Sequence, residues 1–120
     1  MGTARGDDGR SAERLAADYL RAQGLAIVAR NVRSRHGEID LVARDGASLV
    51  FVEVRLRRSG SHGGAAGSIT AAKRARLLAA ARGYLARLAR TPDCRFDVVL
   101  LDRLDPDRIE WLQNAFDADD

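Results

Sequence analysis

The sequence predicts a mixed α/β domain of two helices and about five strands, and three observations lead to this fold class. Apolar residues recur at helical spacing in two segments, residues 11–23 and 70–89. Short apolar or alternating runs of the kind that form strands lie between and after these segments. The second helix separates the third strand from the fourth, and a crossover of this type permits one parallel pair inside an otherwise antiparallel sheet.

The N-terminal half of the domain is predicted to form one helix and three strands. Ser11 is a suitable N-cap for the first helix, and Gly24 is placed to end it. Asp45 and Gly46 are typical of a hairpin turn and join the second strand to the third. An antiparallel meander is therefore expected at residues 25–32, 38–44 and 48–55.

The C-terminal half is predicted to form a loop, the second helix and two more strands. Residues 59–68 are rich in glycine and serine and indicate a mobile loop. The last two strands are expected at residues 96–101 and 108–113. Disorder is expected for residues 1–10 and an acidic tail for residues 117–120, so a single domain would span residues 11–116.

The formal net charge of +3 averages two unlike segments of the chain. Residues 1–101 carry 18 basic and 10 acidic side chains, whereas residues 102–120 carry 2 basic and 7 acidic ones. No carboxylate lies between Glu53 and Asp93, although nine lysine and arginine side chains do. A compositional bias toward arginine does not explain this absence of acids. The block therefore indicates a polyanionic partner.

The sequence favours neither export nor membrane insertion. Cys94 is the single cysteine, which excludes an intramolecular disulfide and a cysteine-based zinc site. The longest unbroken apolar run is far shorter than the roughly 18 residues that cross a bilayer. The N-terminus has no apolar stretch typical of a signal peptide. We therefore expect a cytoplasmic protein without a membrane partner, and the oligomeric state stays open.

Two carboxylates and an arginine are predicted to share one face of the second hairpin, because side chains alternate along a strand. A two-residue Asp-Gly loop would place Asp40 across from Phe51, and a four-residue loop would place it opposite Glu53. Both registers keep Asp40, Glu53 and Arg55 on one face. Neighbouring carboxylates are costly to ionise together without a cation, and hard oxygen ligands favour Mg²⁺ or Mn²⁺. Ion pairs with Arg55 or Arg30 are the structural alternative.

These residues also carry a resemblance to a known family. Residues 37–41, Gly-Glu-Ile-Asp-Leu, and residues 51–55, Phe-Val-Glu-Val-Arg, resemble the paired signature of the YraN-like family of small bacterial proteins. The similarity extends over roughly residues 10–117. That family is similar to the PD-(D/E)xK nucleases, which include Holliday-junction resolvases and restriction enzymes. The resemblance implies a restriction-endonuclease-like αβββαβ core and metal-dependent hydrolysis of phosphodiesters.

The resemblance further implies roles for individual residues. Glu13, Asp40 and Glu53 occupy the positions that surround Mg²⁺ in those nucleases, although a glutamate in the first turn of a helix is also favoured by the helix dipole alone. Arg55 stands where the nucleases have a catalytic lysine. Because arginine stays protonated, it can stabilise charge on a phosphate but cannot act as a base. Lys73, the only lysine of the chain, is the candidate substitute.

Arginines of the first hairpin, the third strand and the second helix are expected to contact nucleic acid. They are Arg33, Arg35, Arg57, Arg58, Arg74 and Arg76. Glu38 is expected to be structural or to support the neighbouring carboxylates, and Cys94 to be a small buried residue.

Three functions from different classes stay open at this point. The first is a Mg²⁺-dependent endonuclease that hydrolyses DNA, with branched or damaged DNA among its candidate substrates. The second is a non-catalytic nucleic-acid-binding module whose site is degenerate because Arg55 replaces the lysine. The third is a protein-interaction adaptor that uses apolar helix faces and the acidic tail. Residue 55 is the feature that separates the first two.

Overall fold

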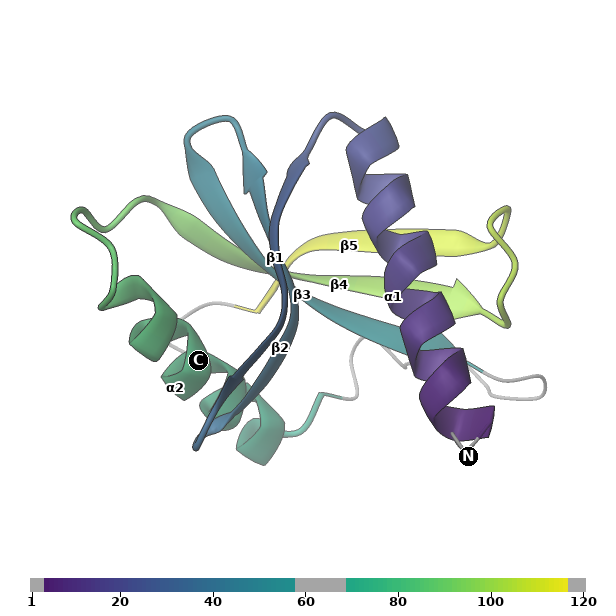
Figure 1. Ribbon diagram of the computed structural model, residues 1–120, viewed down its shortest axis with the longest axis horizontal. Coiled ribbons are helices and arrows are strands. Elements are labelled where there is room, and N and C mark those ends of the chain that lie inside the picture. Colours follow the sequence, from purple (N-terminus) through teal and green to yellow (C-terminus); the bar gives the residue numbers. More distant parts are fainter. Residues whose placement is uncertain (1–3, 58–68, 117–120) are drawn as a thin grey trace.

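The computed structural model describes residues 4–57 and 69–116, which form two helices and a five-stranded sheet (Figure 1). The elements are α1 (Ala4–Ala22), β1 (Ala26–Ser34), β2 (Gly37–Asp45), β3 (Ser48–Arg57), α2 (Ala71–Leu85), β4 (Cys94–Asp102) and β5 (Ile109–Phe116). This order confirms the predicted α/β class with its αβββαβ core, and all five predicted strands are present. The predicted loop at residues 59–68 and the acidic tail at 117–120 lie outside the described residues.

The strands lie in the order β1-β2-β3-β4-β5, and β3 and β4 are parallel while the other pairs are antiparallel. α2 lies in the crossover between the two parallel strands. The two helices cover opposite faces of the sheet (Figure 1). Leu77 of α2 packs in one core with Phe51, whereas Leu20 of α1 packs in the other core with Val50. Alternation along β3 therefore directs Glu53 to the α2 side.

The β2-β3 hairpin sets the position of the two predicted carboxylates. It turns at Gly46, whose φ of 61° lies in the left-handed region that glycine adopts without strain. The cross-strand pairs run from this turn to Leu41 and Val52. Asp40 and Glu53 are the next residues in this register, which is the register of the longer-loop alternative. The hairpin thus directs both carboxylates to one end of the β2-β3 ladder.

A buried carboxylate joins β4 to β5. Asp97 is only 1% exposed. It accepts hydrogen bonds from Nε of Arg95 at 3.0 Å and from the indole N–H of Trp111 at 2.8 Å. The backbone N–H of Asn114 donates a third bond at 2.8 Å, where the β4-β5 register shifts and Asn114 has a φ of 52°. The same arginine reaches Asp45 at 3.1 Å. Asp97 therefore satisfies the polar groups that the irregular end of β5 leaves unpaired in the sheet.

One end of each helix differs from its predicted position: the start of α1 and the end of α2. α1 begins at Ala4 rather than at Ser11, so residues 4–10, expected to be disordered, form its first turns. This stretch contains no proline, and lengthening an existing helix requires no new nucleation. α2 ends at Leu85 rather than at residue 89, because the backbone bonds that follow run from residue i to i−3 and tighten the chain into a turn.

Two further expectations concern the burial of Cys94 and the presence of a membrane-spanning helix. Cys94 is exposed, so the prediction of a buried cysteine is wrong; it is the first residue of β4, at the end of the strand. Neither helix within the described residues has the length and apolar character that crossing a bilayer requires.

Candidate functional site

β2 and β3 separate directly after their last pair, Leu41 with Val52. Beyond this pair β2 continues alongside β1, and β3 continues alongside β4. Ile39 and Val42 both pack in the core on the α2 side, although residues three positions apart on a regular strand lie on opposite faces. β2 therefore twists at Asp40. The separation opens the sheet, so that side chains from both of its faces meet at one point.

Asp40 occupies the point where the strands separate. Its Oδ2 accepts the backbone N–H of Val54 on β3 at 2.8 Å. Burial raises the pKa of Asp40 to about 8, together with the negative charge of Glu53 and a hydrogen bond with the Glu53 side chain, while the Val54 bond opposes this rise. Without a cation, Asp40 is therefore mostly protonated at neutral pH. A positive charge placed beside it would favour the ionised form.

α1 brings Glu13 to this point from the opposite face of the sheet. The adjacent Ala12 is 2% exposed and fixes this part of α1 against the core. Burial raises the pKa of Glu13, and the negative charges of Glu38 and Glu53 act in the same direction. The predicted acidic residue of the first helix thus lies beside the carboxylates of the hairpin.

Asn31 on β1 is a site residue that the sequence pattern did not mark. It lies across from Asp40, between the paired positions on either side. Its φ of 50° is in the left-handed region, which asparagine tolerates better than most residues. A hydrogen bond with the Asn31 side chain lowers the pKa of Glu13 and so opposes the effect of burial. Asn31 therefore ties Glu13 of α1 to the edge of the sheet.

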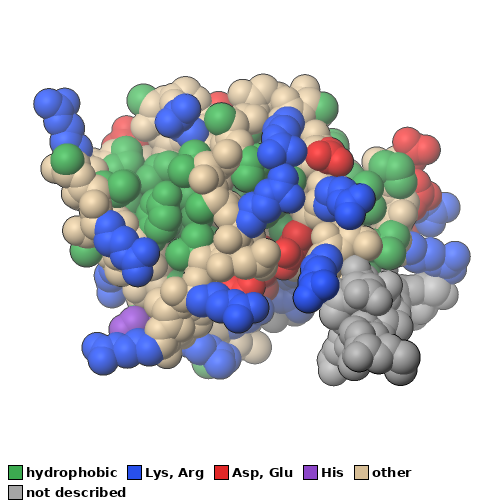
Figure 2. All heavy atoms as spheres, viewed as in Figure 1, with side chains coloured by type: hydrophobic (Ala, Val, Ile, Leu, Met, Phe, Trp, Pro, Cys, Tyr) green, Lys and Arg blue, Asp and Glu red, His purple; other side chains and the backbone are tan. Residues whose placement is uncertain are grey.

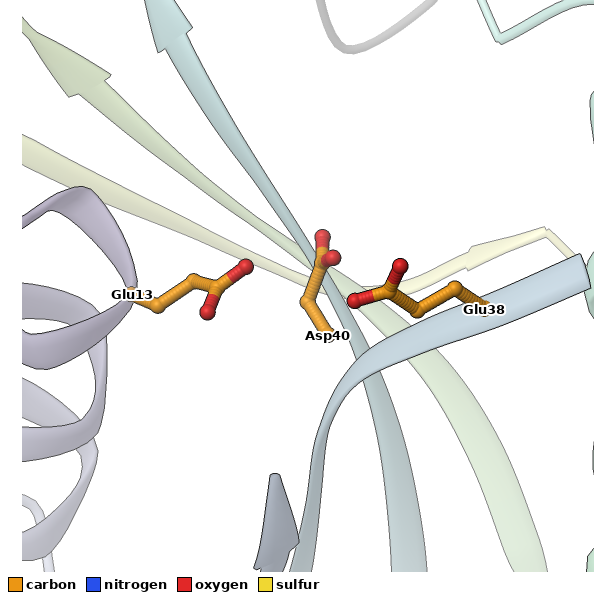
Figure 3. A group of neighbouring side chains, drawn as sticks. All are labelled: Glu13, Glu38 and Asp40. Carbon is orange, nitrogen blue, oxygen red and sulfur yellow. The ribbon is translucent and has the colours of Figure 1, made fainter. Parts of the chain in front are cut away.

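Three carboxylates converge at the separation. Oxygen atoms of Glu13, Glu38 and Asp40 all lie within 4.8 Å of one another. Figure 3 shows Glu13 reaching from α1 and Glu38 from β2 toward Asp40, which lies between them. The Glu38 side chain is 40% exposed and forms the solvent side of the cluster, with Nε of Arg33 at 3.9 Å. Glu38, expected to be a supporting residue, is thus part of the cluster itself.

Glu53 lies on the α2 side of the same gap and contacts the only lysine of the chain. The glutamate is 6% exposed, and its Oε2 lies 2.7 Å from Nζ of Lys73. Lys73 belongs to the first turn of α2, where its backbone N–H donates to the hydroxyl of the N-cap residue Thr70 at 3.1 Å. The structure therefore brings Lys73 to one of the carboxylates that the sequence assigned to a metal ion.

A pocket of about 250 Å³ lies beside these carboxylates. It is lined by Gly37, Glu38, Asp40, Glu53, Lys73, Arg76 and Leu77. Arg55 is half-buried on β3, two residues beyond Glu53, and is not among the described residues that line this pocket. In the described part of the chain, the cationic side chains of the pocket wall thus come from α2 rather than from the strand that carries Glu53.

Basic residues surround the carboxylates. Figure 2 shows Lys and Arg side chains spread around a smaller group of Asp and Glu side chains near the middle of one face. Arg33 and Arg35 are exposed near the tip of the β1-β2 hairpin, and Arg76 is exposed on α2. A Cβ atom at Gly37 would lie 3.4 Å from Cβ of Arg76, so the hairpin tip and α2 are in contact.

The other three predicted nucleic-acid contacts are placed differently. Arg74 is half-buried and donates from Nη1 to the carbonyl of Ile69 at 3.0 Å, so it holds the chain that leads into α2. The side chains of Arg57 and Arg58 lie outside the described residues. Of the six predicted contacts, Arg76 lines the pocket, and Arg33 lies near Glu38, another residue of the pocket wall.

The arrangement combines hard oxygen ligands with adjacent positive charge. Four carboxylates lie where two strands diverge, and burial disfavours the ionised forms of two of them, Glu13 and Asp40. Carboxylate oxygens are the ligands that Mg²⁺ and Mn²⁺ prefer. The fold and this cluster define an α/β protein with a carboxylate-rich site at the divergence of two strands, bordered by lysine and arginine.

The chain belongs to the uncharacterised protein family UPF0102, whose model matches residues 12–101. It is 61% identical over 113 residues to a UPF0102 protein of Cupriavidus taiwanensis, which covers 92% of this chain and 83% of the relative. A UPF0102 protein of Methylobacillus flagellatus is 55% identical over 113 residues, 94% of this chain and 96% of the relative. One of Pseudomonas aeruginosa is 53% identical over 118 residues, 93% of this chain and 94% of the relative. This is the YraN-like family that the paired signature resembles, and the names of these relatives state the family and no activity.

Proposed function

We propose that this protein is a divalent-cation-dependent nuclease that hydrolyses phosphodiester bonds, with DNA as the expected substrate. One observation carries the proposal: carboxylates from α1, β2 and β3 meet at the strand separation, and a lysine of α2 contacts one of them. The resemblance to the PD-(D/E)xK nucleases supports the same assignment, because those enzymes surround Mg²⁺ with acidic residues from the equivalent elements.

The carboxylates fit a hard divalent cation. Without a cation, burial together with the neighbouring negative charges raises the pKa of Asp40 to about 8 and also raises the pKa of Glu13. A bound cation would offset this cost by favouring the ionised forms. The resemblance assigns Mg²⁺ or Mn²⁺ to Glu13, Asp40 and Glu53. The carboxylates whose oxygens lie within 4.8 Å of one another are Glu13, Glu38 and Asp40, so Glu38 is a fourth candidate ligand. Such an ion supplies a Lewis acid for the phosphoryl oxygen and acidifies bound water.

Lys73 and Arg55 have different roles in this proposal. The ammonium group of Lys73 lies at the pocket wall on Glu53, where it favours the approach of a phosphate. Arg55 stays protonated, so its guanidinium stabilises negative charge and cannot accept a proton from water. The lysine that the nuclease pattern places two residues after the glutamate is thus matched by a lysine from α2.

The exposed arginines provide contacts for the phosphate backbone. Arg33 and Arg35 on the β1-β2 hairpin and Arg76 on α2 lie on elements that touch at Gly37, next to the pocket. Contacts with phosphates position a nucleic acid without reading its sequence, and they weaken steeply with salt. The acid-free stretch between Glu53 and Asp93 keeps this surface positive around a negatively charged centre.

A nucleic-acid-binding protein without catalysis is the second candidate, and Arg55 is the observation that favours it. Loss of the lysine of the signature would leave the fold and the basic surface intact while removing the chemistry. The two candidates differ in one measurable respect, which is whether a bound nucleic acid is cut.

The test is cleavage of a panel of duplex, nicked, flapped and four-way-junction DNA by the full chain in Mg²⁺, Mn²⁺ or EDTA. We expect at least one substrate to be cut in Mg²⁺ or Mn²⁺ and none in EDTA. Glu53→Gln is expected to lower the rate by roughly 10²–10³-fold, since it removes a charge that the transition state needs. Asp18→Asn, on the exposed side of α1, is the control and leaves the rate unchanged.

Two other outcomes would replace the proposed nuclease. Salt-dependent binding of DNA without cleavage under every cation would establish the binding module. The absence of both binding and cleavage would favour the protein-interaction adaptor.

A further inference from the structure

Lys73 contacts Glu53, a carboxylate that the proposed function assigns to the divalent cation. The N-cap bond from its backbone N–H to Thr70 fixes the start of α2. From there the side chain, 45% exposed, reaches across to a glutamate side chain that is only 6% exposed, Glu53. The ammonium group therefore covers a buried carboxylate from the solvent side, and it provides the compensating charge that a buried carboxylate requires.

Glu53 differs from the other three carboxylates in what it contacts. Glu13, Glu38 and Asp40 bring oxygen atoms within 4.8 Å of one another, whereas Glu53 directs Oε2 to Lys73. At the same time the side chain of Glu53 hydrogen-bonds with Asp40, so it borders the cluster. The same carboxylate is thus in contact both with the carboxylate cluster and with the lysine.

An ammonium group and a divalent cation repel each other strongly when they share one partly buried carboxylate, because the local dielectric constant is far below that of water. Full use of Glu53 as a ligand to a divalent ion therefore competes with its ion pair to Lys73. The exposed stem of the lysine gives it room to move away, and Arg76 one turn further along α2 lines the same pocket.

We propose that Lys73 acts as an internal counter-ion that exchanges with the divalent cation at Glu53. In the cation-free protein the lysine holds Glu53 in place, and when the divalent ion binds, the ammonium group leaves Oε2 and turns to the pocket rim beside Arg76. Lys73 is a positioning residue in this scheme, acting through Glu53. The inference rests on the proposed cation site and adds that the charge of Lys73 weakens the binding of the ion.

The experiment is calorimetric titration of Mn²⁺ into the full chain as wild type, Lys73→Met, Lys73→Gln and Lys73→Arg. We expect the two neutral variants to bind Mn²⁺ about tenfold more tightly than the wild type and the arginine variant to bind with nearly wild-type affinity. Arg82→Met, at an exposed position later on α2, is the matched control and should bind like the wild type. Structural damage would weaken binding, so tighter binding is a result that a merely structural lysine does not produce.

Thermal unfolding with and without Mn²⁺ keeps the test decisive if a neutral variant is unstable. Loss of the lysine leaves Glu53 buried without a counter-ion, so the neutral variants should have a lower thermal unfolding midpoint than the wild type in EDTA. Mn²⁺ should raise the midpoint of these variants by more than it raises the midpoint of the wild type. Equal or weaker Mn²⁺ binding by both neutral variants would overturn the exchange while leaving the cation site intact. Absence of Mn²⁺ binding in all variants would overturn both, and Mn²⁺ binding without DNA cleavage would overturn only the nuclease.

Discussion

Replacement of Asp40 by asparagine is expected to stabilise the cation-free protein and to abolish its response to Mg²⁺ or Mn²⁺. Asparagine keeps an oxygen that can accept the Val54 N–H, which Asp40 binds at 2.8 Å. Asparagine also removes the negative charge of Asp40, which burial and the neighbouring Glu53 make unfavourable. The variant should therefore unfold at a higher temperature than the wild type in EDTA at pH 8, while its rate of cation-dependent DNA cleavage falls by roughly 10²–10³-fold.

The sign of the pH dependence follows from proton binding. An unfolded aspartate loses its proton near a pKa of about 3.9, whereas the pKa of native Asp40 is raised to about 8. Between these values the native state binds the extra proton, so the free energy of unfolding falls as pH rises through this window. Asparagine removes that fall. The stability advantage of the variant in EDTA should therefore grow steadily from pH 5 to pH 8.

Saturating Mn²⁺ should raise the free energy of unfolding of the wild type and leave that of Asp40→Asn unchanged. A ligand at about 100 times its dissociation constant stabilises the native state by about 2.7 kcal/mol, and only the wild type should gain this stability. The control is Asp18→Asn, whose carboxylate is exposed on α1, and its pH profile should match that of the wild type. Equal Mn²⁺ stabilisation of wild type and Asp40→Asn, or a variant less stable than the wild type at pH 8 in EDTA, would contradict this account of Asp40.

Asp97→Ala should produce the largest loss of stability outside the candidate site. The carboxylate is buried and accepts bonds from Arg95, Trp111 and the backbone of Asn114. Alanine would leave the Trp111 and Asn114 donors unsatisfied and Arg95 with Asp45 as its remaining acidic partner, which costs about 3–5 kcal/mol. For a domain of this size the thermal midpoint should fall by roughly 10–20 °C. Calorimetric or denaturant unfolding measures the change.

A matched control for Asp97 is Asp102→Ala on the same strand. Asp102 is half-exposed and pairs with Nη1 of Arg108 at 3.2 Å, and surface ion pairs of this kind contribute about 0–1 kcal/mol. The loss of stability of Asp97→Asn should lie between those of Asp97→Ala and Asp102→Ala, since an amide oxygen still accepts one hydrogen bond. Similar losses for Asp97→Ala and Asp102→Ala would show that the β4-β5 network does not stabilise the fold.

Local periodicity was sufficient to predict part of the site. Side-chain alternation has a period of two, so it predicted that Asp40 and Glu53 share a face, whichever loop closed the hairpin. The turn then selected one of the two registers, and the pairing of Leu41 with Val52 shows which. The contact of Lys73 with Glu53 depends on how a crossover helix packs against the sheet, a non-local property, so the sequence could offer Lys73 only as a candidate.

Other site residues depend on irregular backbone that periodicity does not describe. Asn31 reaches Glu13 from a left-handed position on β1, whereas Glu38 and Asp40, two residues apart on β2, share a face by alternation alone. Asp97 did have a signal, since a carboxylate inside an apolar strand is costly to bury without partners. The partners of Asp97 on β5 depend on a shifted register, which periodicity does not predict.

The start of α1 shows a different limit. Capping preferences placed the first turn at Ser11, yet the helix begins at Ala4. A good N-cap residue inside a chain predicts where a helix can start, but it does not stop a helix that already extends through it. The earlier start leaves Glu13 within α1, and its position at the cluster comes from the packing of α1 rather than from the end of the helix.

The central claim is that the carboxylates at the β2-β3 separation form a divalent-cation site, and a crystal structure with Mn²⁺ tests it most directly. An anomalous difference map at the manganese edge should show one peak within about 2–2.5 Å of an Asp40 oxygen and of a Glu13 or Glu53 oxygen. Nζ of Lys73 should then lie farther from Glu53 than its present 2.7 Å. Crystals in saturating Mn²⁺ that show no peak at Asp40, with Lys73 still on Glu53, would contradict the claim.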